Sequence, residues 1–319
     1  MKTKFAIGCL VQWYECDIIE EYVDSLKDAI EAYDGQVIVD FTIVGNQDLE
    51  KCTSEEQMNK CIDKIESICN FGNVRYTDDL ETIADYRRLF NTNYCDDVDV
   101  LIWGESDAIL PKQMFIILNN LHKTSLQNNN PKYLAFFGIC KMWDDSWKPL
   151  EHPDFTDKPF IEMDTENWWS LRYNMAQQEM DLINNQVDEL DIQQTNQLKF
   201  NGCGLVISSE VIRSGVNIPK SVFFVHEDTA FMNNCLIHFR NQLPQYIIKN
   251  ILLVHNRKLP NKRMYIKGQD EQDGDMTKMR KQQYWFPNAD KMSQKNAFNT
   301  TEQGYTYSWD DVFREFKND

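Results

Sequence analysis

Apolar residues in the first half of the chain follow two alternating patterns. Short continuous apolar runs, typical of buried strands, occupy positions 5–11, 37–44, 74–77, 98–103 and 133–139. Between these runs the apolar residues recur every three or four positions, which predicts helices over 17–33, 54–69, 80–90 and 111–121. Strands that alternate with helices favour a parallel or mostly parallel sheet with helices on both faces, so the fold class is α/β.

Local signals at the helix starts support these elements. Ser54 and Gln57 have the spacing of a capping box, and Asp79 is placed to cap the helix over 80–90. Pro111 occupies a favoured first-turn position for the next helix, which runs through Leu121 before a polar loop at 127–130.

The regular pattern breaks after residue 140. Residues 141–199 are rich in Asp, Trp, Gln and Asn and form a long excursion, with a helix expected around 171–187. A regular pattern returns at 205–207 and 210–214, followed by a helix from about Asp228 to Phe239 and a last buried strand at 247–254. We therefore expect one main domain over 1–256 that contains the excursion 141–199, followed by a C-terminal extension, 257–319, acting as a lid or packing segment.

Composition narrows the class of protein. The chain has 319 residues, a net charge of -17, and 42% hydrophobic residues, enough for a sizeable core. No apolar run approaches the roughly 20 residues that span a bilayer, and no secretory segment is recognisable at the N-terminus. The nine cysteines include no C-x-x-C pair, which argues against a zinc ribbon and favours a reducing, cytoplasmic location.

Two carboxylates follow the apolar strand 98–103. The sequence continues Gly104-Glu105-Ser106-Asp107, and the next helix lies shortly beyond. Ligands of open parallel sheets bind at the carboxyl ends of strands, where carboxylate oxygens can hold Mg²⁺ or Mn²⁺. Taken alone, the motif is equally compatible with an ordinary acidic loop.

Three further features follow in order. Gly202-Cys203-Gly204 suggests a backbone that passes close to a ligand or, without one, a tight turn. Glu227 and Asp228 precede an amphipathic helix, where one could act as a general base or Asp228 could simply cap the helix. His255 ends a buried strand, where it is either structural or a metal ligand.

These features, in this order, resemble the nucleotide-sugar glycosyltransferases of the GT-A fold, in particular the inverting group two-like class. The resemblance covers about residues 3 to 257 and implies a Rossmann-like, mostly parallel sheet. It implies that Phe5–Glu15, with Val11, Gln12 and Glu15, forms the start of the nucleotide site. Asp79 and either Arg87 or Arg88 also contribute to this site. Glu105, Ser106 and Asp107 correspond to the motif that binds the diphosphate and metal. The first acid of that motif is Glu rather than Asp, so Asp107 is the metal ligand, joined by His255.

The resemblance also implies the chemistry. A sugar leaves a nucleotide-diphosphate donor, most simply a UDP-sugar, with Mn²⁺ or Mg²⁺ neutralising the diphosphate. Asp228 removes the proton of the acceptor hydroxyl, and Glu227 beside it orients the donor or acceptor. Gly202 and Cys203 lie under the acceptor. Trp168 and Trp169 in the excursion could stack on its rings or pack the excursion onto the sheet.

The acceptor is left open by the sequence. A glycan or glycolipid is the commoner acceptor in the family, and the acidic net charge favours it. Hydroxymethylated bases of viral DNA are the alternative, because residues 257–281 form a basic stretch, and the Asn- and Gln-rich chain suggests a viral or bacterial source. A third possibility is an inactive nucleotide-binding or scaffold protein of the same fold. The loop at 11–15 lacks the Gly-rich, basic character that a nucleotidyltransferase needs.

Overall fold

The fold is that of a computed structural model of the chain. It describes residues 2–12, 15, 19–44, 55–67, 73–77, 81–138, 176–195, 202–240, 242–255, 286–298 and 307–314.

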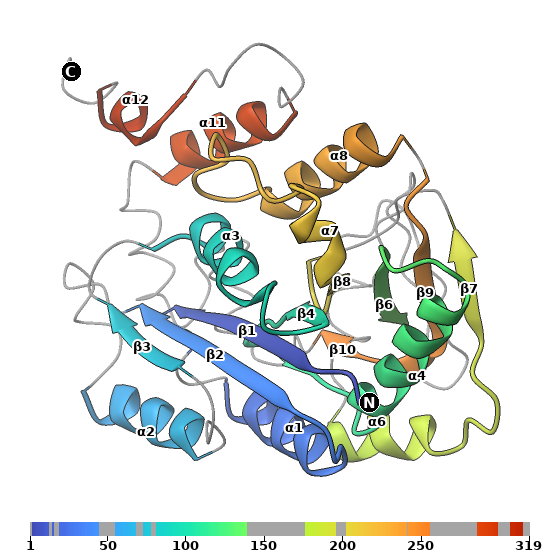
Figure 1. The fold of residues 1–319 in the computed structure, drawn as a ribbon. Helices are drawn as coiled ribbons and strands as arrows, with labels where there is room; N and C mark the ends of the chain where they lie inside the picture. Colours follow the sequence, from blue (N-terminus) through green and yellow to red (C-terminus); the bar gives the residue numbers. More distant parts are fainter. Residues whose placement is uncertain are drawn as a thin grey trace, which may run out of the picture.

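An eight-stranded sheet forms the centre of the molecule, in the order β3-β2-β1-β4-β8-β6-β9-β7 (Figure 1). Its strands are β1 (Phe5–Gln12), β2 (Val37–Val44), β3 (Asn73–Thr77), β4 (Val100–Trp103), β6 (Leu134–Gly138), β7 (Ile192–Thr195), β8 (Val206–Ser208) and β9 (Gln245–Leu252). Strands β1 to β4 are mutually parallel, β6 is parallel to β9, and β8 and β7 run antiparallel to their neighbours. The mostly parallel sheet expected from the sequence is confirmed.

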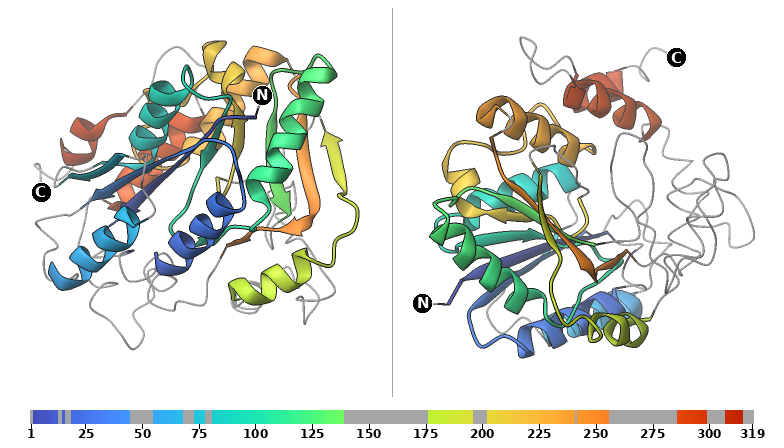
Figure 2. Two further views of the ribbon diagram at one scale, coloured as in Figure 1. Left: turned by 60° about the horizontal axis from the view of Figure 1, so that its bottom comes forward. Right: turned by 90° about the vertical axis from the view of Figure 1, so that its right-hand side faces the viewer.

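Helices cover both faces of this sheet (Figures 1 and 2). The helices on one face are α1 (Glu20–Glu31), α2 (Glu55–Glu66), α4 (Met114–Gln127) and α6 (Gln177–Asn184). On the other are α3 (Ile83–Tyr94), α7 (Ser209–Arg213) and α8 (Glu227–Phe239). Helix α11 (Phe286–Phe298) packs on α8, and α12 (Trp309–Arg314) contacts α11. None of the described helices is long and apolar enough to cross a membrane.

The core forms two layers because the central strands bury side chains on both faces. On the α1 side the rings of Phe5 and Phe115 lie 5.2 Å apart. On the α8 side those of Trp103 and Phe231 lie 5.1 Å apart. This two-sided burial explains why β1 and β4 are continuous apolar runs rather than alternating ones.

Helix α3 begins later than its apolar pattern suggested. Its N-cap is Thr82, whose side-chain oxygen accepts a 3.2 Å hydrogen bond from the amide of Asp85. The prediction that Asp79 caps this helix is therefore wrong. A threonine hydroxyl can satisfy a first-turn amide as an aspartate can, so the sequence alone offered two suitable caps.

Helix α4 is also shifted relative to the expectation. It begins at Met114, three residues after Pro111, whose carbonyl accepts a 2.9 Å bond from the Met114 amide in a preceding turn. It ends at Gln127 rather than Leu121, because Ser125 continues its buried face.

The excursion 141–199 returns to the sheet at its end. Residues 192–195 form β7, an edge strand whose Ile192 lies opposite Ile248 of β9. The apolar pattern predicts no strand here, since Gln193 and Gln194 obscure the short alternation. The expected helix around 171–187 is present as the shorter α6.

A second, two-stranded sheet pairs β5 (Ala108–Ile109) with β10 (Val254–His255). In its antiparallel register His255 lies opposite Ala108, and Val254 lies opposite Ile109. This small sheet fixes the chain just after β4 beside the chain just after β9.

Candidate functional site

Arg87 joins three segments that are far apart in the sequence. Its side chain is only 3% exposed. Nη1 donates to Oε1 of Glu227 at 2.5 Å, while Nη2 donates to Oε1 of Glu105 at 3.0 Å and to the carbonyl of Gly202 at 3.2 Å. The guanidinium therefore connects the motif after β4, the glycine segment before β8 and the first turn of α8.

The glycine segment must come close to Arg87. A Cβ atom on Gly202 would lie 2.6 Å from Nη1 of Arg87, so no larger residue fits without displacing the guanidinium. The segment is fixed to β4 by two 2.9 Å backbone bonds, from Trp103 to Leu205 and from Gly204 to Trp103. Gly204 itself has a φ of +69°, which favours glycine.

Trp103 and Asn91 complete the surroundings of Arg87. The carbon of the guanidinium lies 4.8 Å from the ring centroid of Trp103, within cation–π range. The indole N–H of Trp103 donates to Oδ1 of Asn91 at 2.9 Å. Neither residue is among the site residues predicted from the sequence. The signals that could have found them were a tryptophan directly before the acidic motif and an asparagine one helical turn after Arg87.

Helix α8 begins one residue earlier than expected. Its N-cap is His226, in the left-handed conformation with a φ of 67°, and no side chain caps the helix there. Glu227 is buried in the first turn, and Asp228 beside it is half-buried. Oδ1 of Asp228 accepts a 2.6 Å bond from the amide of Thr229. Asp228 is thus a first-turn residue and not the N-cap.

Burial and neighbouring charges shift the pKa values of Glu227 and Arg87 in this cluster. Burial raises the pKa of Glu227 to about 7, against the opposing effect of the Arg87 charge, and Asp228 raises it further. Burial by itself would lower the pKa of Arg87, but Glu227 and Glu105 raise it above its usual range. Arg87 is therefore a permanent cation among acids, one of which titrates near neutrality.

The β5–β10 pair brings the two predicted metal ligands into neighbouring positions. Asp107 is 3% exposed and directly precedes Ala108, the residue that lies opposite His255. The structure describes the backbone of His255 but not its side chain. Among the side chains that it does describe, no three His, Cys, Asp or Glu residues are grouped to hold a metal.

Other predicted site residues lie deeper than expected. Val11 is fully buried in the core below α1, and Cys203 is 3% exposed in the same core, so only their backbones are available to a ligand. Ser106 and Glu15 are also buried, at 2% and 6% exposure. Gln12 ends β1, and the structure describes only its backbone.

Several predicted positions lie outside the described residues. These are Asp79, Trp168, Trp169 and the basic stretch 257–281. Arg88, the neighbour of Arg87, lies among the described residues and makes different contacts. It donates to the carbonyls of Ile218 and Pro219, both at 3.0 Å, and thereby holds the loop that leads to α8.

Comparisons with known proteins give structural likeness but no sequence match. No family model matches the chain, and no curated protein matches it in sequence. TarS from S. aureus, residues 1–349, is 8% identical with a TM-score of 0.46, over 94% of this chain and 72% of that one. The same protein in complex with UDP-GlcNAc is 9% identical with a TM-score of 0.44, over 78% and 57%.

A third solved structure is a complex of an enzyme from Mycobacterium tuberculosis. This is glucosyl-3-phosphoglycerate synthase with Mn²⁺, UDP-glucose and glycerol 3-phosphate. It is 12% identical with a TM-score of 0.39, over 84% of this chain and 77% of that one. These likenesses concern the arrangement of the chain and not its chemistry.

Proposed function

We propose that the chain is a metal-dependent glycosyltransferase that moves a sugar from a nucleotide-diphosphate sugar to a hydroxyl acceptor with inversion. The observation that carries the proposal is the convergence on Arg87. Glu105, Gly202 and Glu227 come from three motifs that the resemblance assigns to one site, and all three contact this guanidinium. They meet beyond the carboxyl end of β4, where ligands of open α/β sheets bind.

Asp107 and His255 would hold the metal. A carboxylate and an imidazole form a donor set that suits Mn²⁺. The pairing of Ala108 with His255 supports this, because it sets the two residues on adjacent backbone segments. A bound divalent ion would supply charge neutralisation for the departing diphosphate. The donor is most simply a UDP-sugar, with the chain around Gln12, Glu15 and Asp79 facing the nucleotide.

Asp228 is the proposed general base. Glu227, the other acid at this position, is buried and bonded to Arg87, so it is better suited to hold the site together than to exchange protons with an acceptor. Asp228 is half-buried, and Thr229 donates to its Oδ1 from both its amide and its hydroxyl, which leaves Oδ2 able to accept the proton of an acceptor hydroxyl. Removal of this proton as the acceptor attacks gives single displacement and inversion.

The proposed acceptor is a glycan or glycolipid hydroxyl. The net charge of -17 disfavours a polyanion such as DNA, which needs basic residues to neutralise its phosphates. Trp168 and Trp169 are proposed to contact the acceptor sugars, since indole faces stack on sugar rings.

Calorimetric titration of the full chain with UDP, GDP, CDP and ADP, each with and without Mn²⁺, tests the donor and the metal together. We expect UDP to bind tightest and only with Mn²⁺. Transfer itself is tested by incubating UDP-sugars with hydroxyl acceptors and following UDP release and the anomeric configuration of the product. Failure of all four nucleotides to bind, with or without Mn²⁺, would contradict the proposal.

A further inference from the structure

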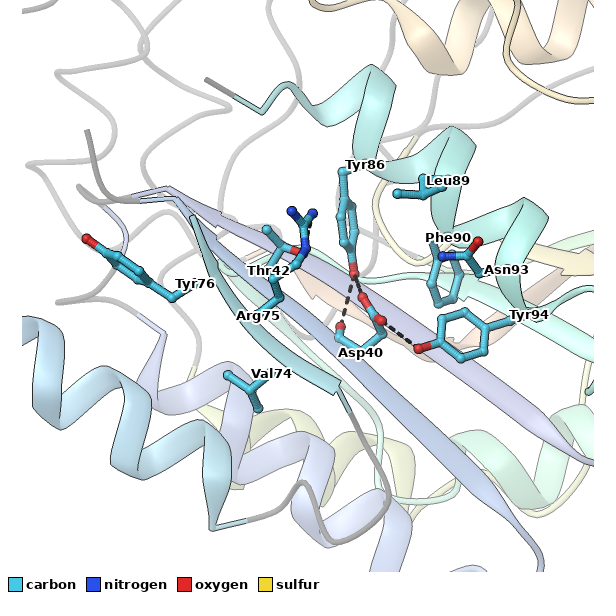
Figure 3. Close-up of a pocket in the computed structure, with 10 residues that line it drawn as sticks. All are labelled: Asp40, Thr42, Val74, Arg75, Tyr76, Tyr86, Leu89, Phe90, Asn93 and Tyr94. Carbon is cyan, nitrogen blue, oxygen red and sulfur yellow. Dashed lines mark hydrogen bonds between the residues drawn. The ribbon is translucent and has the colours of Figure 1, made fainter. Parts of the chain in front are cut away.

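A cavity lies away from the Arg87 cluster, between α3 and the strands β2 and β3 (Figure 3). Its volume is about 660 Å³, within the roughly 300–1,000 Å³ of small-molecule sites. Helix α3 separates it from Arg87 by presenting two different faces. Arg87 and Asn91 point toward Trp103, whereas Tyr86, Phe90 and Tyr94 line the cavity.

Asp40 places a carboxylate on the strand side of this cavity. It stands in the middle of β2, between the apolar residues Val39 and Phe41, where a charged residue is unusual. Tyr86 donates to Oδ1 at 2.7 Å and Tyr94 donates to Oδ2 at 2.6 Å. These two bonds fix the orientation of the carboxylate, and each of its oxygens can accept a further hydrogen bond. Burial and the charge of Asp40 raise the pKa of Tyr86, which therefore stays a donor.

Hydrogen-bond donors stand on both sides of Asp40. Figure 3 shows Arg75 on one side of it and Asn93 on the other. Arg75 donates to Oγ1 of Thr42 at 3.2 Å and forms an ion pair with Glu81. Since Glu81 and Asp40 together offset the charge of Arg75, the cavity offers no excess positive charge to a phosphate. The same Arg75 opposes an ammonium ligand beside Asp40.

Part of the remaining lining is apolar. Phe90 and Leu89 contribute an aromatic and an aliphatic surface from α3, and Leu89 is 50% exposed at the rim. A sugar ring has hydroxyls that both donate and accept, together with apolar C–H faces. It could donate to Asp40, accept from Arg75 and Asn93, and lay an apolar face on the exposed side chain of Leu89.

We propose that this cavity binds a neutral saccharide unit of one or two sugars, as a site separate from the one around Arg87. The proposal does not depend on the transfer reaction, because it stands on the residues of α3, β2 and β3 alone. In a protein that acts on glycans, such a site would hold part of the glycan away from the reaction centre.

The experiment is calorimetric titration of the full chain with maltose, lactose and cellobiose. We expect at least one of them to bind, and the same dissociation constant in the presence of saturating UDP and Mn²⁺. The test variant is Leu89→Ala/Asn93→Ala, which removes one apolar contact and one donor from the exposed face of α3 and should weaken binding roughly tenfold. Both residues are solvent-exposed, so the variant should fold.

The matched control is Leu126→Ala/Asn128→Ala near the end of α4. Leu126 is 48% exposed, nearly the same as Leu89, and lies outside the cavity. This control should bind the saccharide as the wild type does. Binding of none of the three disaccharides, equal weakening in both variants, or displacement of the saccharide by UDP would each overturn the proposal. UDP binding weakened by the test variant alone would assign the cavity to the nucleotide and overturn it as well.

Discussion

Ionisation of Glu227 makes the unfolding free energy of the protein depend on pH. The side chain is buried against Arg87 in the first turn of α8, and its pKa is raised from 4.5 to about 7, chiefly by burial. Between these values the folded protein holds a proton that the unfolded chain has released. The stability that Glu227 contributes is therefore complete below about pH 4.5 and is lost as the pH rises through about 7.

Glu227→Gln should remove this dependence, because glutamine keeps the shape and cannot ionise. We expect the unfolding free energy of the wild type, relative to the variant, to fall by up to roughly 3 kcal/mol between these pH values and to level off above them. Urea denaturation at half-unit pH steps measures the difference. A difference that is constant with pH would contradict the raised pKa.

Asp228→Asn tests whether this side chain is the general base of the proposed reaction. Asparagine keeps the size of aspartate and can still accept the hydrogen bond from Thr229, so folding and donor affinity should change little. It cannot take the proton of the acceptor, and kcat should fall by roughly 10²–10⁴-fold. Steady-state UDP release measures kcat, and calorimetry measures the donor affinity.

Asp310→Asn is the matched control, because Asp310 occupies the first turn of α12, as Asp228 does in α8. It should leave kcat unchanged. Near-normal turnover in Asp228→Asn would remove Asp228 from the mechanism and transfer the role of base to Glu227.

Helix α3 is the element that connects the Arg87 cluster with the cavity beside Asp40. One of its faces carries Arg87 and Asn91, and the other carries Tyr86, Phe90 and Tyr94. The start of the helix fixes the position of Arg87, which lies in its second turn. The cap at Thr82 therefore affects the position of Arg87 as well as the stability of the fold.

Thr82→Ala should destabilise the protein by about 1 kcal/mol, since the amide of Asp85 loses its side-chain acceptor. Thr82→Ser retains the hydroxyl and should stay within a few tenths of a kcal/mol of the wild type. Urea denaturation of the three proteins provides the measurement. Equal loss in both variants would indicate that the methyl group, rather than the cap, is responsible.

The β5–β10 pair positions the proposed metal ligands Asp107 and His255, as helix α3 positions Arg87. Asp107→Ala should abolish Mn²⁺-dependent UDP binding, because it removes the buried carboxylate beside this pair. His255→Ala should weaken that binding less, since water can occupy one vacated position. Titration with UDP at fixed Mn²⁺ measures both, with Asp96→Ala, 85% exposed at its side chain, as the control. Unchanged Mn²⁺-dependent affinity in a folded Asp107→Ala protein would exclude the assignment.

At the scale of the whole molecule, the C-terminal helix α11 supports the segment that leads into α8. Phe223, Ala289 and Met292 form a small apolar cluster. Ser293 donates to the carbonyl of Val225 at 2.6 Å and accepts from its amide at 3.1 Å. A helix near the end of the chain thereby fixes the backbone immediately before Glu227.

Asn296→Ala tests this support. The amide of Asn296 donates to the carbonyl of Ser221 at 2.8 Å and to that of Tyr307 at 2.7 Å, and both bonds would be lost. We expect a loss of roughly 1–3 kcal/mol in unfolding free energy. Gln294→Ala, on the exposed side of the same helix, should have little effect. Equal stability of the two variants would indicate that the bonds of Asn296 add nothing, and that α11 contributes through Ser293 and its apolar contacts.

The sequence by itself determined the α/β class and, apart from the two-residue strand β5, the succession of strands and helices up to residue 138. Each of these elements carries its own local pattern, either a continuous apolar run or a helical repeat, and such patterns depend only on neighbouring residues. The order of the motifs along the chain was also enough to single out Glu105, Asp107, Glu227 and Asp228 as the candidate acids.

Only the tertiary structure decided how those residues are used. Nothing local distinguishes Arg87 from Arg88, yet one is buried between two carboxylates and the other holds a loop by its carbonyls. The choice depends on which face of α3 meets β4, and that follows from the packing of the sheet. For the same reason the sequence could not reveal that Trp103 lies against Arg87, or that two tyrosines of α3 hold Asp40. These contacts join residues that are neighbours only after the chain has folded.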